Sequence, residues 1–133
     1  MADGDVTYLT GDLANGYMCG VFTSASTADV EVLCGFQPRR VVLRSALGGV
    51  IAKYEWHAGM DEGGYFLLQD TGSAQNYYYR ASGGITLFAG ELEGLADDGA
   101  TMNEAKAEGF TIPASLEQLN DTASQDNFWE AWR

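Results

Sequence analysis

The sequence predicts an all-β fold, specifically an antiparallel β-sandwich or jelly roll with one long acidic loop. Three observations lead to this class. First, 17 glycines against two prolines are typical of many tight turns between short extended segments. Second, residues 29–34 and 50–56 alternate between two faces with the two-residue period of a half-buried strand. Third, strand candidates recur about every 10 residues, which is the spacing found in sandwiches.

The chain has the size and composition of one domain. Its 133 residues are 46% hydrophobic and include seven Tyr, six Phe and three Trp, enough large side chains to build a core without a metal or a disulfide framework. No repeat of fixed period and no linker divides the sequence. We therefore expect a single β domain over residues 1–133.

The strand candidates begin with a hairpin. Residues 7–10 and 17–23 form its two strands, because turn-forming residues at 11–16 join them. The next candidate, residues 29–34, separates apolar side chains from acids, so the acids should face water. Its apolar face consists of Val30, Val32 and Cys34, and its acidic face of Asp29 and Glu31.

Two further strands follow near the middle of the chain. Residues 39–44 predict a strand with a basic outer edge, since Val41 and Leu43 lie on one side and Arg40, Val42 and Arg44 on the other. Residues 50–56 show a second clear period of two, and Trp56 should close the core there. One face is Val50, Ala52, Tyr54 and Trp56, opposite Ile51, Lys53 and Glu55.

The second half of the chain contains more short strands and the acidic loop. Strands are expected at residues 65–68, 76–80 and 85–88, separated by glycine-rich turns at 70–73 and 82–84. From Gly90 to Glu108, six acids stand against Lys106 alone, which predicts a long acidic loop.

The C-terminal region offers two short helical signals and a last strand. Residues 105–107 favour a helical turn, and residues 115–118 resemble a capping box. In residues 127–133, Phe128, Glu130 and Trp132 alternate with Trp129, Ala131 and Arg133, which predicts a C-terminal strand within a sheet.

The charge of the chain argues against several partners. A net charge of −12 repels the phosphate backbone of nucleic acids and anionic membranes, so neither is an expected partner. The N-terminus lacks the basic and apolar regions of a secretory signal, and no apolar run approaches the roughly 20 residues that span a bilayer. We expect a soluble protein made in the cytoplasm, with Cys19 and Cys34 as reduced thiols, although the alternation around them allows both to point inward.

The sequence contains no recognisable catalytic or metal-binding pattern. His57 is the only histidine, no nucleophile-elbow sequence accompanies it, and one His with two distant Cys matches no zinc pattern. The acids at 3–5 and 97–98 do not extend into a calcium-binding loop, although a structural calcium ion or a hydrolase with paired carboxylates stays an alternative. We therefore expect no enzyme activity, no catalytic residues, no cofactor and no metal.

Two clusters are candidates for an interface. Tyr77, Tyr78 and Tyr79 lie in one strand candidate, so at least one ring should be exposed or in a contact. Arg39, Arg40 and Arg44 are three of only seven basic residues. These arginines could pair with the acidic loop of a neighbouring copy, or form scattered surface ion pairs of little energetic value.

The order of several short elements resembles small β domains in structural proteins of tailed bacteriophages. The similarity covers Gly35 to Arg133, about three-quarters of the chain. The acidic insertion at 91–108 and the missing glycine in 121–125 depart from the family's pattern. The matching pieces are Gly35-Phe36-Gln37-Pro38 with Val41-Val42-Leu43, Tyr54-Glu55-Trp56, Gly59-Met60, Gly83-Gly84-Ile85-Thr86, Gly109-Phe110-Thr111-Ile112, Leu119-Asn120 and Trp129-Glu130-Ala131-Trp132-Arg133.

The resemblance implies a role in a virus particle and transfers no active site. It predicts a virion structural protein made in the host cytoplasm, in the first place a capsid decoration (cement) protein on the capsid exterior. Its partners would be the major capsid protein or another virion protein, and we expect a homo-oligomer, with a trimer as the first guess. The alternative is a carbohydrate- or receptor-binding module of a head or tail fibre.

Overall fold

The structure is a computed structural model that describes residues 2–12, 16–47, 50–89, 94–95, 102–103, 108–114, 116–117, 119–120 and 124–133. Every paired strand is antiparallel, and the described residues contain no helix. The strands form two main sheets and one small hairpin sheet. The predicted antiparallel β-sandwich is therefore confirmed.

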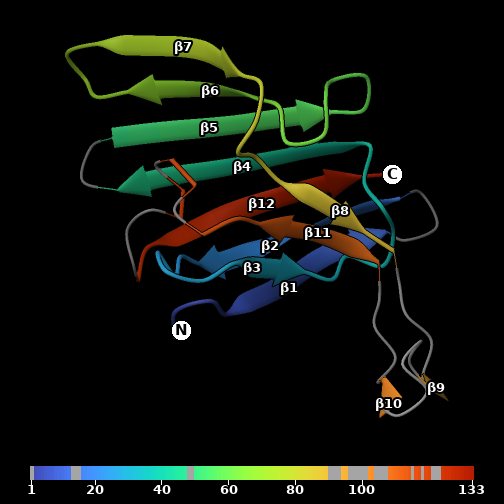
Figure 1. The fold of residues 1–133 in the computed structure, drawn as a ribbon. Helices are drawn as coiled ribbons and strands as arrows, with labels where there is room; N and C mark the ends of the chain where they lie inside the picture. Colours follow the sequence, from blue (N-terminus) through green and yellow to red (C-terminus); the bar gives the residue numbers. More distant parts are fainter. Residues whose placement is uncertain are drawn as a thin grey trace.

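The large sheet has seven strands. In spatial order they are β1 (Val6–Asp12), β2 (Tyr17–Thr23), β12 (Asp126–Trp132), β4 (Arg40–Leu47), β5 (Val50–His57), β6 (Tyr65–Asp70) and β7 (Gln75–Arg80). The second sheet has three strands in the order β3 (Val30–Val32), β11 (Gly109–Ile112) and β8 (Thr86–Phe88). The hairpin sheet pairs β9 (Gly94–Leu95) with β10 (Met102–Asn103) and lies apart from the other two sheets (Figure 1).

The three-stranded sheet covers the half of the large sheet that contains β1, β2 and β12, whereas β5, β6 and β7 extend beyond it (Figure 1). The core lies between the two layers. Trp129 is its largest fully buried side chain, and its ring meets those of Tyr8 and Phe110 edge to face. Apolar residues from both sheets complete it, among them Phe22, Val30, Val32, Val41, Leu43, Leu67 and Ile112.

The last strand of the chain lies in the middle of the large sheet. β12 pairs with β2 on one side and with β4 on the other. Its side chains alternate as the sequence predicts: Asn127, Trp129 and Ala131 are buried, whereas Phe128 and Glu130 point away from the core. The predicted C-terminal strand is confirmed, and it joins the two halves of the sheet.

The part of the large sheet beyond the second sheet is covered by loops instead. The buried Tyr54 hydroxyl accepts a hydrogen bond from the Ile85 backbone N–H at 2.9 Å. Gly84 is needed there, because a side chain would begin 2.6 Å from that hydroxyl oxygen. Leu116 and Leu119 are buried from the same side. The inner face of β5 and β6 is thereby kept from water.

Most strands predicted from the sequence occur in the structure. The faces of residues 29–34 are as predicted, and Ala52, Tyr54 and Trp56 are buried as predicted. Arg40 and Arg44 are exposed on the outward side of β4 as predicted, and β4 lies between β12 and β5 in the sheet. The sequence shows a Gly-Phe-Thr element at β11 but predicts no strand there. Four residues are too few for a two-residue alternation to be recognised.

Other sequence expectations fall outside the described residues. The acidic loop from Gly90 to Glu108 is described only at 94–95, 102–103 and 108, and the helical turn at 105–107 is not described. Of the capping box, Leu116 and Glu117 are described and are not helical.

The two cysteines do not meet. Cys34 is buried, with its thiol 3.1 Å from the Phe36 carbonyl oxygen, whereas Cys19 is partly exposed on the opposite side of the large sheet. Both thiols are free. The suggestion that both point inward is wrong, because Cys19 alternates with Gly20 and Phe22, which face the core.

Candidate interaction face

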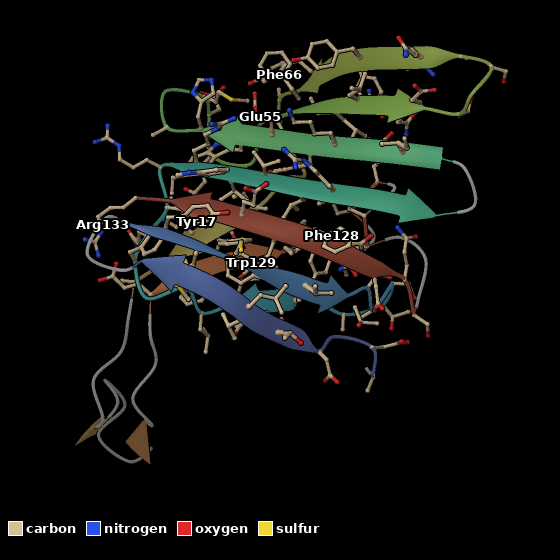
Figure 2. All side chains as sticks on the ribbon, turned by 180° about the vertical axis from the view of Figure 1, so that it is seen from behind. Tyr17, Glu55, Phe66, Phe128, Trp129 and Arg133 are labelled. Atoms are coloured by element: carbon tan, nitrogen blue, oxygen red, sulfur yellow. The ribbon has the colours of Figure 1, made fainter. Side chains whose placement is uncertain are left out.

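The face of the large sheet turned away from the second sheet is called the outer face here. No other described element covers it, and side chains such as Tyr17, Glu55, Phe66 and Phe128 rise from it (Figure 2). Among the residues whose side chains the structure describes, five of the seven exposed large hydrophobic ones lie on it, with Leu9, Tyr77 and Phe128 exposed by 62%, 65% and 52%. The other two of the five are Ile51 and Tyr79. Such a concentration of apolar surface on one side indicates a contact site.

An aromatic cluster lies at the β7 end of the outer face. The Phe66 ring is stacked on Tyr77, with 5.6 Å between centroids and 8° between planes. The same ring lies 5.2 Å from Tyr79 in a tilted arrangement. These contacts arise because Phe66 pairs with Tyr79 in the ladder and lies diagonally opposite Tyr77. The cluster therefore has a fixed shape although Tyr77 and Tyr79 are largely exposed.

The centre of the outer face carries paired charges. Arg40 lies 3.0 Å from Glu55, and Arg44 lies 3.4 Å from Glu130. The guanidinium of Arg40 also stacks 4.7 Å from the centroid of Trp132. Such half-exposed pairs add little to stability, but they hold the charged groups in fixed places.

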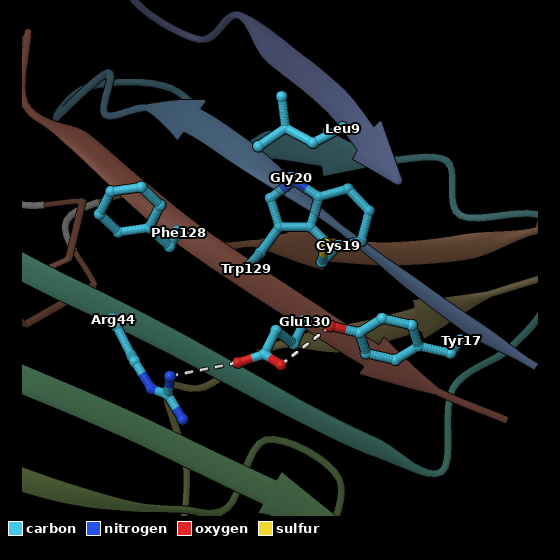
Figure 3. Close-up of a pocket in the computed structure, with 8 residues that line it drawn as sticks. All are labelled: Leu9, Tyr17, Cys19, Gly20, Arg44, Phe128, Trp129 and Glu130. Carbon is cyan, nitrogen blue, oxygen red and sulfur yellow. Dashed lines mark hydrogen bonds and ion pairs between the residues drawn. The ribbon is translucent and has the colours of Figure 1, made fainter. Parts of the chain in front are cut away.

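A pocket of about 260 Å³ opens at the β2 end of the outer face (Figure 3). Glu130 lies at its polar side, where the Tyr17 hydroxyl donates a hydrogen bond to it at 3.0 Å and Arg44 pairs with it. Burial, together with the neighbouring Cys19 and the Glu130 carboxylate, raises the pKa of Tyr17. The tyrosine therefore stays a neutral donor. The pocket is lined by Leu9, Tyr17, Cys19, Gly20, Arg44, Phe128, Trp129 and Glu130.

The interface candidates from the sequence divide between two faces. Arg40, Arg44, Tyr77 and Tyr79 lie on the outer face, and the ladder Arg44–Lys53–Leu68–Tyr77 connects the two clusters across four strands. Tyr78 points to the opposite face. Its hydroxyl donates to Glu117 at 2.7 Å. Arg39 is exposed just before β4, where its backbone N–H donates to Trp132.

Several residues of the outer face were not singled out from the sequence: Leu9, Cys19, Ile51, Phe66 and Phe128. Alternation gave a signal for two of them. Ile51 lies opposite the buried side of its strand, and only one of Phe128 and Trp129 can face the core. Leu9 lies at the bulge in β1 between Tyr8 and Thr10. A bulge changes the alternation of side chains, and nothing in the sequence marks it.

Among the described residues, no group of three or more His, Cys, Asp or Glu side chains is arranged to hold a metal ion. His57 is exposed at the end of β5, with its ring Nδ1 3.1 Å from the Ala58 carbonyl oxygen. In the described part of the chain no helix is long and apolar enough to cross a membrane. What the outer face provides chemically is apolar contact area and fixed charges.

Comparisons with known proteins do not add a family. No family model matches the chain, and no curated protein or solved structure matches it at a significant level.

Proposed function

We propose that the chain is a structural protein of a tailed-bacteriophage particle, made in the host cytoplasm, and that it works as a capsid decoration protein on the capsid exterior. Two things support this proposal. The ordered short elements from Gly35 to Arg133 resemble β domains of such particles. The outer face has the apolar surface of a protein that functions by contact.

The observation that carries the proposal is the uncovered outer face itself. A soluble sandwich normally presents polar side chains on the outward side of each sheet, because that side meets water. Here the outward side presents Leu9, Ile51, Tyr77, Tyr79 and Phe128 instead. A protein with a net charge of −12 stays dispersed until such a face meets its partner.

The experiment is a binding assay with undecorated capsids of the phage that encodes the chain. The purified protein is titrated onto the capsids near physiological salt, and bound protein is separated by sedimentation. We expect saturable binding with a fixed number of copies per capsid. Serum albumin, another acidic protein, serves as the control for trapping in the pellet. Absence of co-sedimentation would rule out the decoration role.

A second candidate function is carbohydrate or receptor binding by a fibre module. The specific observation in its favour is the Phe66–Tyr77–Tyr79 cluster, since exposed aromatic rings of fixed orientation stack on sugar rings. A glycan array distinguishes the two. Binding that is lost in Tyr77→Ala and kept in Tyr78→Ala would favour this candidate, because only Tyr77 is on the outer face. An array without any signal removes it.

A further inference from the structure

The side chains of the outer face are arranged in rows that run across the strands. Ladder partners on neighbouring strands point to the same side, so each row follows directly from the register. Successive rows are two residues apart, about 6.7 Å along the strands. Row 1 is Tyr17, Trp132, Arg40 and His57; row 2 is Cys19, Glu130, Val42, Glu55, Phe66 and Tyr79; row 3 is Val21, Phe128, Arg44, Lys53, Leu68 and Tyr77. Row 4 contains Thr23, Asp126, Ile51, Asp70 and Gln75.

The two central rows carry charges of opposite sign. Row 2 carries the carboxylates Glu55 and Glu130, and row 3 carries the cations Arg44 and Lys53. Row 1 contains Arg40, and row 4 contains Asp70 and Asp126. The described strands of this face thus hold three of the seven basic residues of the chain and five of its 19 acids, because Asp12 pairs with Tyr17 at the β1 end of row 1. The face therefore carries only a small part of the chain's net charge of −12.

This pattern is complementary to itself under one rotation. A two-fold axis that lies in the plane of the face, perpendicular to the strands and between rows 2 and 3, places row 2 of one copy against row 3 of the other, and row 1 against row 4. Each Glu55 then lies opposite Lys53 of the second copy. An axis parallel to the strands would instead place each row against itself, with acids facing acids. Charge therefore selects the first arrangement.

The apolar residues fit the same rotation. Phe66 comes to lie opposite Leu68 of the second copy, and Tyr79 opposite Tyr77, so the aromatic clusters of the two copies meet. At the other end, each Phe128 lies opposite Glu130 of the second copy, over the pocket that Leu9, Cys19 and Tyr17 line. The exposed rings of Tyr77 and Tyr79 are thereby covered by aromatic surface, whereas Phe128 meets the side chain of Glu130.

The face is large enough for a stable contact. Seven strands at about 4.8 Å and four rows at about 6.7 Å give a footprint of roughly 600 Å² per copy, or about 1,200 Å² in total, which is the lower end of specific interfaces. The twist of each sheet would set the strands of the two copies at about 30° to each other, as in aligned sheet packing.

We infer that the outer face binds the outer face of a second copy of this chain, in a two-fold dimer that opposes Glu55 and Lys53. Lys53 supports this assignment, because it has no ion-pair partner among the described residues although it lies beside Arg44 and two rows of fixed charges. This proposal differs from the trimer that the family resemblance suggested. The same face supports the proposed decoration role, so a capsid would have to displace the second copy from it.

The test uses two charge reversals that repair each other. Lys53→Glu puts carboxylates opposite one another at both symmetry-related positions, and Glu55→Lys puts two ammonium groups there. Each variant alone should dissociate more readily, by about tenfold or more, since like charges across an interface cost free energy. In an equimolar mixture, both positions regain opposite charges. Sedimentation equilibrium over a concentration series should show a wild-type mass approaching twice 14.3 kDa, monomeric variants and a restored heterodimer.

Two controls make the outcome decisive. Glu31→Lys, on the outward side of β3, changes the net charge equally and should leave the dimer intact. Circular dichroism reports whether the variants fold, and Tyr77→Ser, on the exposed edge strand, tests the same contact without a change of charge. A monomeric or trimeric wild type, or a mixture that stays monomeric, overturns the inference. Capsid binding is measured separately by co-sedimentation with the wild-type chain, so failure of the dimer can be told from failure of the decoration role.

Discussion

Single residues in the core differ in what their polar atoms contribute. Tyr54 is fully buried, and its hydroxyl is the acceptor for the Ile85 backbone N–H. Burial raises the pKa of this hydroxyl, so it stays protonated. By contrast, the indole Nε1 of Trp129 is buried without a hydrogen-bond partner. The first side chain fixes a loop through a hydrogen bond, whereas the second stabilises the core by packing alone.

A first prediction concerns this tyrosine. Tyr54→Phe removes the acceptor and leaves a buried N–H unsatisfied, so the free energy of unfolding should fall by about 1–3 kcal/mol. Urea denaturation measures it. Tyr77→Phe is the matched control: it removes a hydroxyl from a ring that is 65% exposed, and it should change stability by less than about 0.5 kcal/mol. Equal effects of the two variants would contradict the assigned role.

The two thiols give a second prediction at this scale. Cys34 is 1% exposed, and burial raises its pKa, whereas Cys19 is partly exposed on the outer face. In dilute native protein, a thiol reagent should react quickly with one equivalent per chain and with the second only after unfolding. Cys19→Ser should abolish the fast phase. Two fast thiols, or none owing to a disulfide, would show that the placement of these residues is wrong.

Among the elements, the segment from Pro113 to Asn120 depends on polar anchors. The buried Asn120 side chain accepts from the Ala25 N–H at 2.7 Å and donates to the carbonyl oxygens of Ala28 and Pro113. Glu117 accepts hydrogen bonds from Tyr65, Tyr78 and Arg80. These contacts hold the segment against β6 and β7, which the three-stranded sheet does not cover.

Glu117 should make stability depend on acidic pH. Partial burial opposes ionisation, but the hydrogen bonds from Tyr78, Arg80 and Tyr65 outweigh it and lower the pKa of Glu117 below its ordinary value of 4.5. A carboxyl whose pKa is lower in the folded state stabilises above the unfolded pKa, and this stabilisation is lost as the pH falls through the folded pKa.

The third prediction follows for Glu117→Gln. At neutral pH the variant should be less stable by about 1 kcal/mol, a value reduced by the partial exposure of the group. The difference from the wild type should shrink as the pH falls below about 4.5. Thermal unfolding from pH 7 to pH 3 measures it, with Asp61→Asn as a control. A difference that stays constant over this range would show that the carboxylate charge is not the cause.

For the whole molecule, the position of the last strand matters most. β12 provides the ladder partners of both β2 and β4, and it brings Trp129 and Asn127 into the interior. Cooperative folding therefore requires the last residues of the chain to pair with strands from its first third.

A fourth prediction tests this dependence. A chain ending at Gln125 should lose cooperative unfolding altogether, because β2 and β4 would each keep an unpaired edge around a missing tryptophan. A chain without Arg133 alone should fold, since it loses one backbone hydrogen bond to Gly16 and a contact with Phe36. Circular dichroism melting curves of the two chains compare them. A cooperative transition in the shorter chain would contradict the central role of β12.

The sequence correctly predicts the strands whose side chains alternate regularly between the core and the solvent. Every second residue of two segments faces the core as the alternation predicts: Val30, Val32 and Cys34 in one, and Ala52, Tyr54 and Trp56 in the other. A strand with one solvent-exposed face must alternate in this way wherever it lies in the sheet. The sequence does not predict the bulge at Leu9, where the two-residue alternation is broken. It does not predict β11 either, because four residues are too few for the alternation to be recognised. Strand order is not predicted from the sequence, because alternation is the same in central and edge strands.

The sequence by itself determined that this protein is an all-β sandwich and which side of most strands faces the core, since both follow from local alternation and turn residues. Only the tertiary structure decided which outward-facing side chains of different strands lie next to one another. The rows of Glu55, Lys53, Phe66 and Tyr77 join residues from separate strands, and that order is set by strand register and by packing over long sequence distances. A surface built in this way has no signal within any one segment, so the face proposed to bind a second copy becomes visible only in the folded sheet.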